Sequence, residues 1–417
     1  MDKKGDNLIY WIWLSNATQG SPLLANTLLK FFGGVKEIYE ANEEELKQVK
    51  MKEKRLELLS DKSLEASEKI IEYCDKNSVG IATLDDYFYP QKLRSLVDRP
   101  VLLYYLGNFI DFDNMPCVAV VGTRNPSDYA TVCAKRVSLD LAKSGIVTVS
   151  GLASGIDSCA HKASLYNDSL TVGVLGCGID VIYPKENSEL YHQVAQGGLI
   201  LTEYPPSTPP LGRNFPQRNR IIAALANITV VVEGSERSGA LITAEHTLRQ
   251  KKPLYSVPGS IFYPGCAGSN FLLTIGADPL LGSYNVIQDL EKQFPDKVKY
   301  IPRKDEDEKK PSKEEKRLFS GKNQIRVSQA KIPPVFDKET KKTSEKSDNF
   351  SPPPSITELN EQELKIYTKL SQEPMNPNEL ADDDLPIKTV LKLLTALEIK
   401  GYVTRHPGAK FSLFREE

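Results

Sequence analysis

Short apolar runs rich in valine and isoleucine alternate with segments of helical periodicity over the middle half of the chain, residues 81–290. The runs lack polar alternation, which is typical of strands buried on both faces. They lie at 117–121, 147–149, 171–175, 199–202, 228–232 and 254–257, with predicted helices at 128–143, 155–165, 187–196, 218–226 and 239–250. This repetition predicts an α/β domain, and right-handed crossovers make it a Rossmann-like, doubly wound parallel sheet.

The first region, residues 1–80, has a helical pattern of its own. Ser21-Pro22 predicts a helix start, and Gly33-Gly34 predicts its end. Paired helices around Gly-Gly are similar to small SAM-like or helix-hairpin-helix domains, some of which bind the DNA backbone. Glu43, Glu44 and Glu45 would repel phosphate, which favours a packing or dimerisation role instead.

The last part of the chain divides into a linker and a small domain. Residues 291–355 are rich in charges of both signs, have little apolar periodicity and predict a disordered linker. Residues 356–417 regain periodicity, and three helices followed by a hairpin around Pro407-Gly408 indicate a winged helix. This domain offers few cations, so we expect protein docking rather than DNA recognition from it.

Composition narrows the function classes. The 417 residues carry 53 Lys+Arg and 55 Asp+Glu, a formal net charge of −2, which excludes a histone-like basic protein but leaves local cationic patches open. No apolar run is long enough to span a bilayer and no signal peptide is visible, so no membrane association is expected. Six scattered cysteines without a CxxC pair favour the reducing cytoplasm, and the four histidines never pair at ligand spacing, so no metal is expected.

Unusual short motifs follow the predicted strands at their carboxyl ends, where doubly wound sheets bind ligands. A glycine at such a turn is often there for steric reasons, but several loops on one edge line a common groove. Glycine backbones, a helix N-terminus, hydroxyls and an arginine suit an anion, so we predict a phosphate-bearing ligand. The candidate residues are Gly122, Thr123, Arg124, Ser150, Gly151, Ala153, Ser154, Gly155, Gly176, Gly178, Ser238 and Gly239.

The sequence lacks the motifs of two common nucleotide-binding sites. The dinucleotide signature GxGxxG does not follow Val121, and no acidic residue ends the second strand to hold a ribose. The P-loop GxxxxGK[ST] is also absent, so NTP hydrolysis lacks its lysine and its magnesium hydroxyl. A dehydrogenase or an ATPase is therefore not expected, and no cofactor is predicted.

One arginine-rich stretch, Arg213 to Arg220, has no acid near it in the sequence. Arg213, Arg218 and Arg220 are the only charged residues between Tyr204 and Val232. Unpaired arginines beside Phe215, Asn214 and Asn219 suit single-stranded nucleic acid, with arginine on phosphates and phenylalanine under a base. The alternative is an arginine cluster paired with distant acids such as Glu203 or Glu233.

These motifs resemble those of the bacterial DNA-processing protein A family, also called DprA or Smf. The resemblance covers Asp85 to about Leu290 and rests on DYFYP at 86–90 with PVLLY at 100–104, VVGTR at 120–124, SGLASGID at 150–157, LGCGID at 175–180 with Tyr183-Pro184, and NFPQRNR at 214–220 with SGALIT at 238–243. It implies a non-enzymatic protein that binds and protects single-stranded DNA. It also implies loading of the RecA recombinase past the single-strand-binding protein, which is displaced, during natural transformation, and homodimers formed through the sheet domain.

The resemblance assigns roles residue by residue. Phosphate contacts fall to Gly122, Thr123, Arg124 and 150–155, strand contacts to Arg213, Phe215, Arg218, Asn219 and Arg220, and Ser238, Gly239 and Thr243 complete the pocket. The long charged linker departs from the family's compact pattern. A related superfamily, the nucleotide 5′-monophosphate phosphoribohydrolases, is the competing class, with Glu245 in the place of their catalytic glutamate. A signalling-nucleotide sensor is a third, weaker interpretation.

Overall fold

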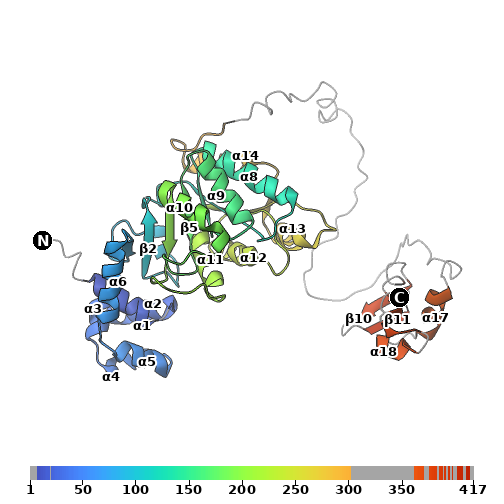
Figure 1. The fold of residues 1–417 in the computed structure, drawn as a ribbon, viewed down its shortest axis with the longest axis horizontal. Helices are drawn as coiled ribbons and strands as arrows, with labels where there is room; N and C mark the ends of the chain where they lie inside the picture. The colour runs from blue at the N-terminus through green and yellow to red at the C-terminus, as the bar shows by residue number, and fades with distance from the viewer. Residues whose placement is uncertain are drawn as a thin grey trace, which may run out of the picture. The chain divides into compact units, whose positions relative to one another are not determined.

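The computed structural model describes residues 7–18, 20–301 and, in the C-terminal region, 361–370, 375–382, 385–387, 389–390, 393–394, 397, 402–406 and 410–413. The chain splits into two compact units, 1–320 and 321–417, and each is described by itself. Figure 1 shows the larger unit with its small all-helical part beside the sheet. None of the helices described is both long and apolar enough to cross a membrane.

The N-terminal helices are α1 (Leu8–Ala17), α2 (Pro22–Phe32), α3 (Val35–Glu40), α4 (Glu43–Leu46), α5 (Glu53–Ser60) and α6 (Glu65–Lys76). The predicted helix after Ser21 is confirmed: Ser21 is its N-cap, Pro22 occupies its first turn, and Gly33 ends it in the left-handed conformation at φ 90°. Trp11, Ile12 and Leu28 belong to one apolar cluster with Tyr104 and Val194 of the next domain. The helical domain therefore shares a continuous core with the sheet domain.

The large sheet has nine strands in the order β1-β2-β6-β5-β4-β3-β7-β8-β9. They are β1 (Gly80–Thr83), β2 (Leu102–Gly107), β3 (Cys117–Val121), β4 (Val147–Ser150), β5 (Thr171–Val174), β6 (Leu199–Thr202), β7 (Ile228–Val231), β8 (Leu254–Ser256) and β9 (Asp278–Pro279). Strands β3 to β9 are parallel, which confirms the predicted doubly wound α/β class. The sheet is not wholly parallel, since β2 runs antiparallel to both β1 and β6 at one edge.

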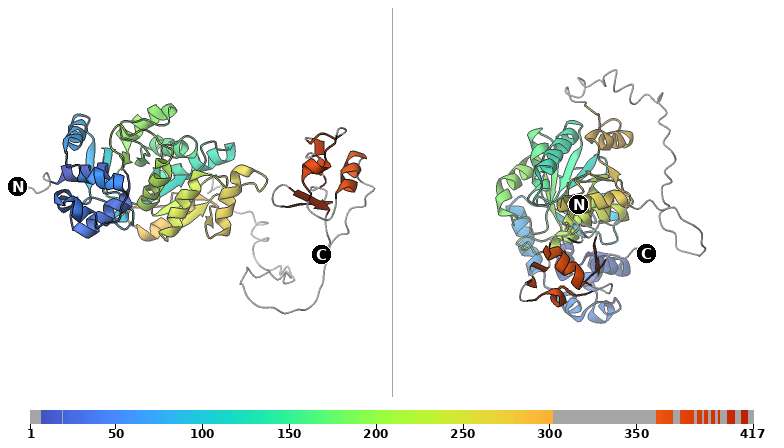
Figure 2. Two further views of the ribbon diagram at one scale, coloured as in Figure 1. Left: turned by 90° about the horizontal axis from the view of Figure 1, so that it is seen from below. Right: turned by 90° about the vertical axis from the view of Figure 1, so that its right-hand side faces the viewer.

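Helices cover both faces of this sheet (Figure 2). They are α7 (Gln91–Arg94), α8 (Asp128–Lys143), α9 (Ile156–Tyr166), α10 (Ser188–Gly197), α11 (Asn214–Leu225), α12 (Gly239–Arg249), α13 (Ala267–Thr274) and α14 (Ser283–Gln293), with 3₁₀ turns η1 (Lys185–Asn187) and η2 (Pro264–Cys266). Helices α8 and α9 pack together, as do α11 and α12. Val298 is buried in the core of the sheet domain, so packing continues beyond α14 into residues predicted as linker.

Helix α11 begins one turn earlier than the apolar pattern predicts. Its first residue is Asn214 rather than Arg218, so the arginine-rich stretch is helical from its second residue onward. Pro216 falls in the first turn, where a missing N–H costs no intrahelical hydrogen bond. The sequence NFPQR is thus compatible with a helix start, and this places Phe215 and Arg218 on one rigid element.

The smaller unit holds α17 (Glu361–Lys369), α18 (Pro377–Leu380) and a hairpin of β10 (Val403–His406) and β11 (Lys410–Leu413). Helical residues at 389–390, 393–394 and 397 contribute Val390, Leu394 and Leu397 to its core. These elements agree with the predicted helices and hairpin. The linker predicted at 291–355 lies outside the described residues from 302 onward.

Candidate nucleic-acid interface

A pocket opens at the carboxyl ends of β3, β4 and β7. Strand β3 pairs with β4 on one side and β7 on the other, so the chain order reverses there and the flanking loops diverge. The pocket has a volume of about 700 Å³. We call it the sheet pocket; it is lined by Val121, Gly122, Thr123, Arg124, Ala153, Asp157, Tyr183, Pro210, Gly212, Phe215, Pro216, Arg218, Asn219, Ile222, Ser235, Ser238, Gly239, Ala240, Ile242 and Thr243.

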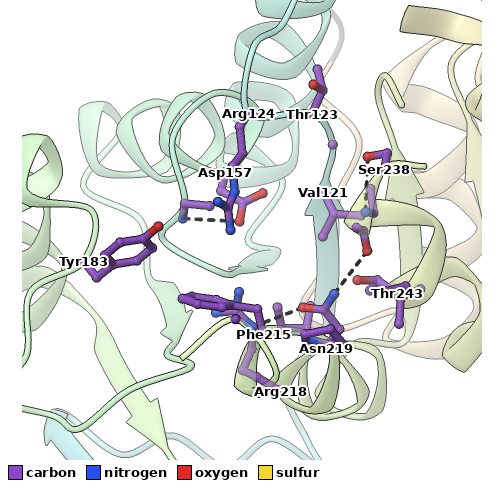
Figure 3. Close-up of a pocket in the computed structure, with 18 of the residues that line it drawn as sticks. Val121, Thr123, Arg124, Asp157, Tyr183, Phe215, Arg218, Asn219, Ser238 and Thr243 are labelled. Carbon is purple, nitrogen blue, oxygen red and sulfur yellow. Dashed lines mark hydrogen bonds between the residues drawn. The ribbon is translucent and has the colours of Figure 1, made fainter. Parts of the chain in front are cut away.

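Two aromatic rings and an exposed arginine form one side of the sheet pocket (Figure 3). The rings of Tyr183 and Phe215 are tilted by 44° with centroids 5.3 Å apart. The Arg124 guanidinium lies 5.5 Å from the Phe215 centroid, in cation–π range. Arg124 is exposed and forms no ion pair within the described residues, so both its charge and an aromatic face are available to a ligand.

Arg218 is different, because it is buried and two of its three guanidinium nitrogens donate hydrogen bonds within the protein. It is 4% exposed. Its guanidinium donates to the backbone oxygens of Gly151, at 2.9 Å, and Val174, and its Nε donates to Asn219 Oδ1 at 3.1 Å. Burial lowers the pKa of Arg218, and the nearby Asp157 carboxylate opposes that shift. Arg218 therefore joins α11 to the ends of β4 and β5. Its guanidinium carbon also lies over the Phe215 ring, 5.8 Å from the ring centroid.

In the loop after β4, two of the N–H groups predicted to face an anion, those of Gly151 and Ala153, already have an acceptor within the protein. The Asp157 carboxylate accepts hydrogen bonds from Gly151 N at 3.0 Å and from Ala153 N at 3.4 Å. Burial raises the pKa of Asp157, and Arg218 opposes that shift. Asp157 thus accepts two N–H groups of the glycine-rich loop, and its charge opposes that of the neighbouring Arg218.

Most of the remaining predicted residues of the glycine-rich loops have structural roles. A Cβ on Gly155, at φ 79°, would collide with the carbonyl oxygens of Thr123 and Arg124, and one on Gly151 would lie 2.6 Å from an Arg218 nitrogen. A Cβ on Gly176 would lie 2.9 Å from the Phe215 ring. The steric interpretation of these glycines is therefore the one that the contacts support. The predicted residues outside the lining of the sheet pocket are Ser150, Gly151, Ser154, Gly155, Gly176, Gly178, Arg213, Asn214 and Arg220.

The hydrogen bonds of three further loop residues explain their position. Ser150 is fully buried, and its hydroxyl donates to Val120 O at 2.7 Å, across neighbouring strands. Ser154 donates to Glu186 at 3.0 Å. Gly178 N donates to Thr208 O at 2.9 Å. These groups stabilise the loops around the pocket.

Arg220 is not an unpaired cation. It is 2% exposed, its Nη2 lies 2.6 Å from the Glu203 carboxylate, and its Nε lies 3.1 Å from Asp98. The alternative of a distant acid partner, with Glu203 named, is therefore correct for this arginine. Asn214 is buried as well, and Arg213 is exposed but faces away from the sheet pocket.

The start of α12 forms the opposite wall. Ser238 is its N-cap and accepts a hydrogen bond from Ala240 N at 3.3 Å. Asn219 donates to Gly239 O at 3.1 Å, which ties α11 to α12. Thr123 N donates to Glu233 O at 2.8 Å, so the loops after β3 and β7 are joined too. The predicted residues Thr123, Ser238, Gly239 and Thr243 thus meet in one wall with Asn219.

Glu245, the residue that the hydrolase alternative needs, lies outside the sheet pocket. Its carboxylate pairs with Arg249 at 2.5 Å, one turn further along α12, and both side chains are more than half exposed. Asp157 is the single acid in the described lining, and it is occupied by Arg218 and backbone N–H groups. In the described parts of the chain, no three His, Cys, Asp or Glu side chains gather as a metal site requires.

Among the lining residues that were not predicted as site residues, Tyr183 and Asp157 contribute most to the chemistry of the pocket. Tyr183 was noted only as part of a motif, and Asp157 only as the end of another, although the structure places both in the pocket. An aromatic residue followed by proline after a glycine-rich strand end was the available signal for Tyr183. No local signal marked Asp157, because its role depends on Arg218, which is remote in sequence.

Comparison with known proteins gives consistent matches. Residues 80–291 match the family described as DNA recombination-mediator protein A, and residues 350–409 match the DprA winged helix domain. Protein Smf of Synechocystis sp. is 32% identical over 412 residues, covering 96% of this chain and 98% of that protein. DNA processing protein DprA of Streptococcus pneumoniae is 41% identical over 208 residues, covering 50% of this chain and 73% of that protein. An X-ray structure of the S. pneumoniae protein superimposes with a TM-score of 0.60 at 31% identity, covering 67% of this chain and 97% of that chain.

Proposed function

This chain belongs to the DNA recombination-mediator protein A family, also named DprA or Smf, and on that premise we propose that it binds single-stranded DNA in the sheet pocket. The observation that carries the proposal is the group formed by Tyr183, Phe215 and Arg124. An aromatic face beside an exposed guanidinium that has no ion pair in the described part of the chain suits a base and its phosphate. We assign the contacts with single-stranded DNA to these three residues and to five others that line the pocket, namely Thr123, Asn219, Ser238, Gly239 and Thr243.

The same geometry favours single strands over duplex. A base can stack on Phe215 only when one of its faces is free, and bases inside a duplex already stack on each other. The cavity volume of about 700 Å³ also suits inserted bases better than a whole duplex. Arg124 can leave the Phe215 ring for a phosphate without losing an ion pair, since it has none within the described residues.

Oligonucleotide binding measured by fluorescence anisotropy tests this proposal. We expect single strands to bind more tightly than duplex of the same length, with affinity that falls steeply as salt rises. Phe215→Ala removes the stacking surface and weakens binding by roughly 1–3 kcal/mol, and Arg124→Ala weakens it by a smaller amount and flattens the salt dependence. Equal affinity for duplex, or an unchanged affinity in both variants, would place the DNA elsewhere.

Matched controls come from exposed residues of the same kinds. Tyr166, 85% exposed, and Arg249, 71% exposed, lie outside the sheet pocket. Tyr166→Ala and Arg249→Ala therefore keep wild-type affinity. Losses of equal size in the controls would mean that the effect comes from charge or stability in general rather than from the pocket.

We further propose that the protein loads RecA onto strands coated by single-strand-binding protein, without catalysing a reaction itself. The resemblance supports the loading activity, and the position of Glu245 outside the pocket supports the absence of catalysis. Filament formation by RecA on coated strands, with and without the protein, is the direct measurement. No acceleration of loading at saturating protein would contradict the proposal and leave DNA binding standing.

A homodimer is proposed on the sheet domain. The loop after β8 and helix α13 expose Ile261, Phe262, Phe271 and Ile275, and Asn270 fixes the loop to the helix through Gly259. Exposed apolar patches of this kind mark protein interfaces. Sedimentation equilibrium is the check, and a monomer at micromolar concentration would contradict it.

A cytoplasmic location is proposed as well, since DNA and RecA are found there and all six cysteines are free.

A further inference from the structure

A second hollow lies where the helical domain meets the sheet domain. The turn between α1 and α2, the start of α5 and the segment 204–217 enclose a volume of about 950 Å³. Its lining includes Lys54, Arg55, Asp98, Arg213, Gln217 and Arg220. We call it the junction hollow.

The two walls of the junction hollow are fixed to each other. Trp11 Nε1 donates to Asp85 at 2.8 Å, and Asn26 Nδ2 donates to Arg99 O at 2.8 Å. Gly20, at φ 68°, lies close against the Tyr204 ring, since a Cβ there would be 3.5 Å from Cε1. The hollow is therefore preformed, and no domain movement is needed to assemble it.

The junction hollow has more positive charge than its acids can balance. Asp98 is the single acid in its described lining, and it pairs with Arg220 at 3.1 Å. Lys54, Arg55 and Arg213 have no ion pair within the described residues. One guanidinium nitrogen of Arg55 and one of the nearly fully buried Arg220 also lack a hydrogen-bond partner. Unbalanced cations with unused donors indicate an anionic ligand.

The junction hollow and the sheet pocket share one wall. Pro210, Gly212 and Phe215 line the sheet pocket, and Leu211, Arg213 and Asn214 line the junction hollow. Successive residues of this short segment thus face opposite sides. At Gly212 an added Cβ would meet no atom within 4 Å, so a polymer that leaves the sheet pocket across this residue finds open space and meets Arg213 next.

We propose that the junction hollow binds the backbone phosphates of the same single strand, as a second contact site beyond the sheet pocket. This inference rests on the proposed function, and it gives the helical domain a part in DNA binding. The shared wall favours a nucleic-acid strand over an acidic peptide, because the two cationic sites lie next to each other along one path. Lys54, Arg55 and Arg213 contact phosphate oxygens, and the Gln217 amide supplies a further polar contact.

A length series of oligo(dT) on the full-length protein tests the inference. In the wild type, affinity rises with length until both sites are filled and then levels off. The Lys54→Ala/Arg55→Ala variant keeps wild-type affinity for the shortest oligomers that bind and loses roughly five- to tenfold on the longest ones. The slope of log affinity against log salt falls by about 0.7 for each phosphate contact removed, measured on the long strand.

The matched control is Lys50→Ala/Lys76→Ala. It removes two exposed charges from the same domain at positions that line neither site, so it keeps the wild-type length dependence. A loss of equal size in this control, or a loss that does not depend on length in Lys54→Ala/Arg55→Ala, would overturn the inference.

The outcomes separate this inference from the proposed function. If no oligomer binds the wild type, the proposed function fails. If short oligomers bind through Phe215 and longer ones gain nothing from Lys54 and Arg55, the second site alone fails. A poly-glutamate peptide is the last comparison. If it binds the wild type but not Lys54→Ala/Arg55→Ala, while long strands bind the wild type and this variant equally, the occupant is an acidic peptide and the inference is wrong.

Discussion

The arginines around helix α11 occupy two contrasting regions. Arg124 and Arg213 are exposed and have no ion pair in the described parts of the chain. Arg218 and Arg220 are 4% and 2% exposed; Arg218 donates to backbone oxygens, and Arg220 pairs with Glu203 and Asp98. All four come from motifs that look equally basic in the sequence. The difference teaches that burial, rather than motif membership, separates the arginines that stabilise the pocket from those that are free to bind phosphate.

The buried region balances its own charges. Burial raises the pKa of the Glu203 carboxyl, and Arg220 opposes that shift. Burial also works to lower the pKa of Arg220, but Glu203 and Asp98 outweigh it, so the pKa lies above its ordinary value. Ions removed from water need such partners, and taking one away leaves the other uncompensated. The exposed region has no such constraint, and its charges remain available to a ligand.

The largest expected effect comes from Arg220. Arg220→Ala leaves Glu203 buried without its partner, and the free energy of unfolding falls by about 3–5 kcal/mol. The exposed counterpart, Arg213→Ala, changes it by about 0.5 kcal/mol or less. Denaturant unfolding followed by circular dichroism measures both.

A second variant keeps this comparison testable if Arg220→Ala does not fold. The double change Glu203→Leu/Arg220→Met removes both charges and recovers much of the lost stability. Equal unfolding midpoints for Arg220→Ala and Arg213→Ala would remove the distinction between the two regions.

Local pattern was sufficient for the fold and for the position of the site. The strands at 117–121, 147–150, 171–174, 199–202 and 228–231 follow from apolar runs, and their carboxyl ends placed Gly122, Thr123, Arg124, Ser238 and Gly239 in one pocket. Both results depend on short-range periodicity and on the geometry of parallel sheets. The antiparallel β1 and β2 were missed because β1 is a four-residue edge strand and because the direction of β2 depends on its pairing with β1 and β6, which are remote in sequence.

Pairing across long sequence distances was not predictable. The acid-free stretch around Arg213–Arg220 indicated unpaired cations, but folding brings Asp98 and Glu203 to Arg220 and Asp157 to the vicinity of Arg218. Arg213 and Phe215 line different cavities, because residues of the segment 210–215 face different sides. Neither fact is encoded by spacing along the chain, because both depend on the packing of separate elements.

A smaller effect is expected on the pH dependence of unfolding, through a histidine in the buried region. His161 is fully buried, and its Nδ1 lies 2.7 Å from Thr171 Oγ1. Burial, with a contribution from Arg218, lowers its pKa from 6.5 to about 3. The folded state therefore binds fewer protons than the unfolded state between these values. The contribution of neutral His161 to the free energy of unfolding is complete above pH 6.5. It is lost as pH falls toward 3, by up to about 1.4 kcal/mol per pH unit.

Unfolding measured between pH 7 and pH 4.5 tests this. His161→Gln, even if less stable at neutral pH, loses the extra pH dependence in that window. The exposed His192 is the matched control, and His192→Gln keeps the wild-type pH dependence. A wild-type slope that persists in His161→Gln would assign the acid sensitivity to other groups.

The smallest expected effect concerns Glu245, an exposed acid on α12 whose partner, Arg249, is also exposed. Such surface pairs contribute little, so Glu245→Gln changes stability and single-strand affinity by less than about 0.5 kcal/mol. Neither wild type nor variant releases free base from a nucleoside monophosphate, as measured by chromatography of the products. Base release by the wild type that is lost in Glu245→Gln would give this exposed residue a catalytic role. It would also make the sheet pocket a substrate site, so that exposure would no longer separate binding from stabilising residues. The geometry argues the other way, because the acid that does line the pocket, Asp157, is held by Gly151, Ala153 and the charge of Arg218.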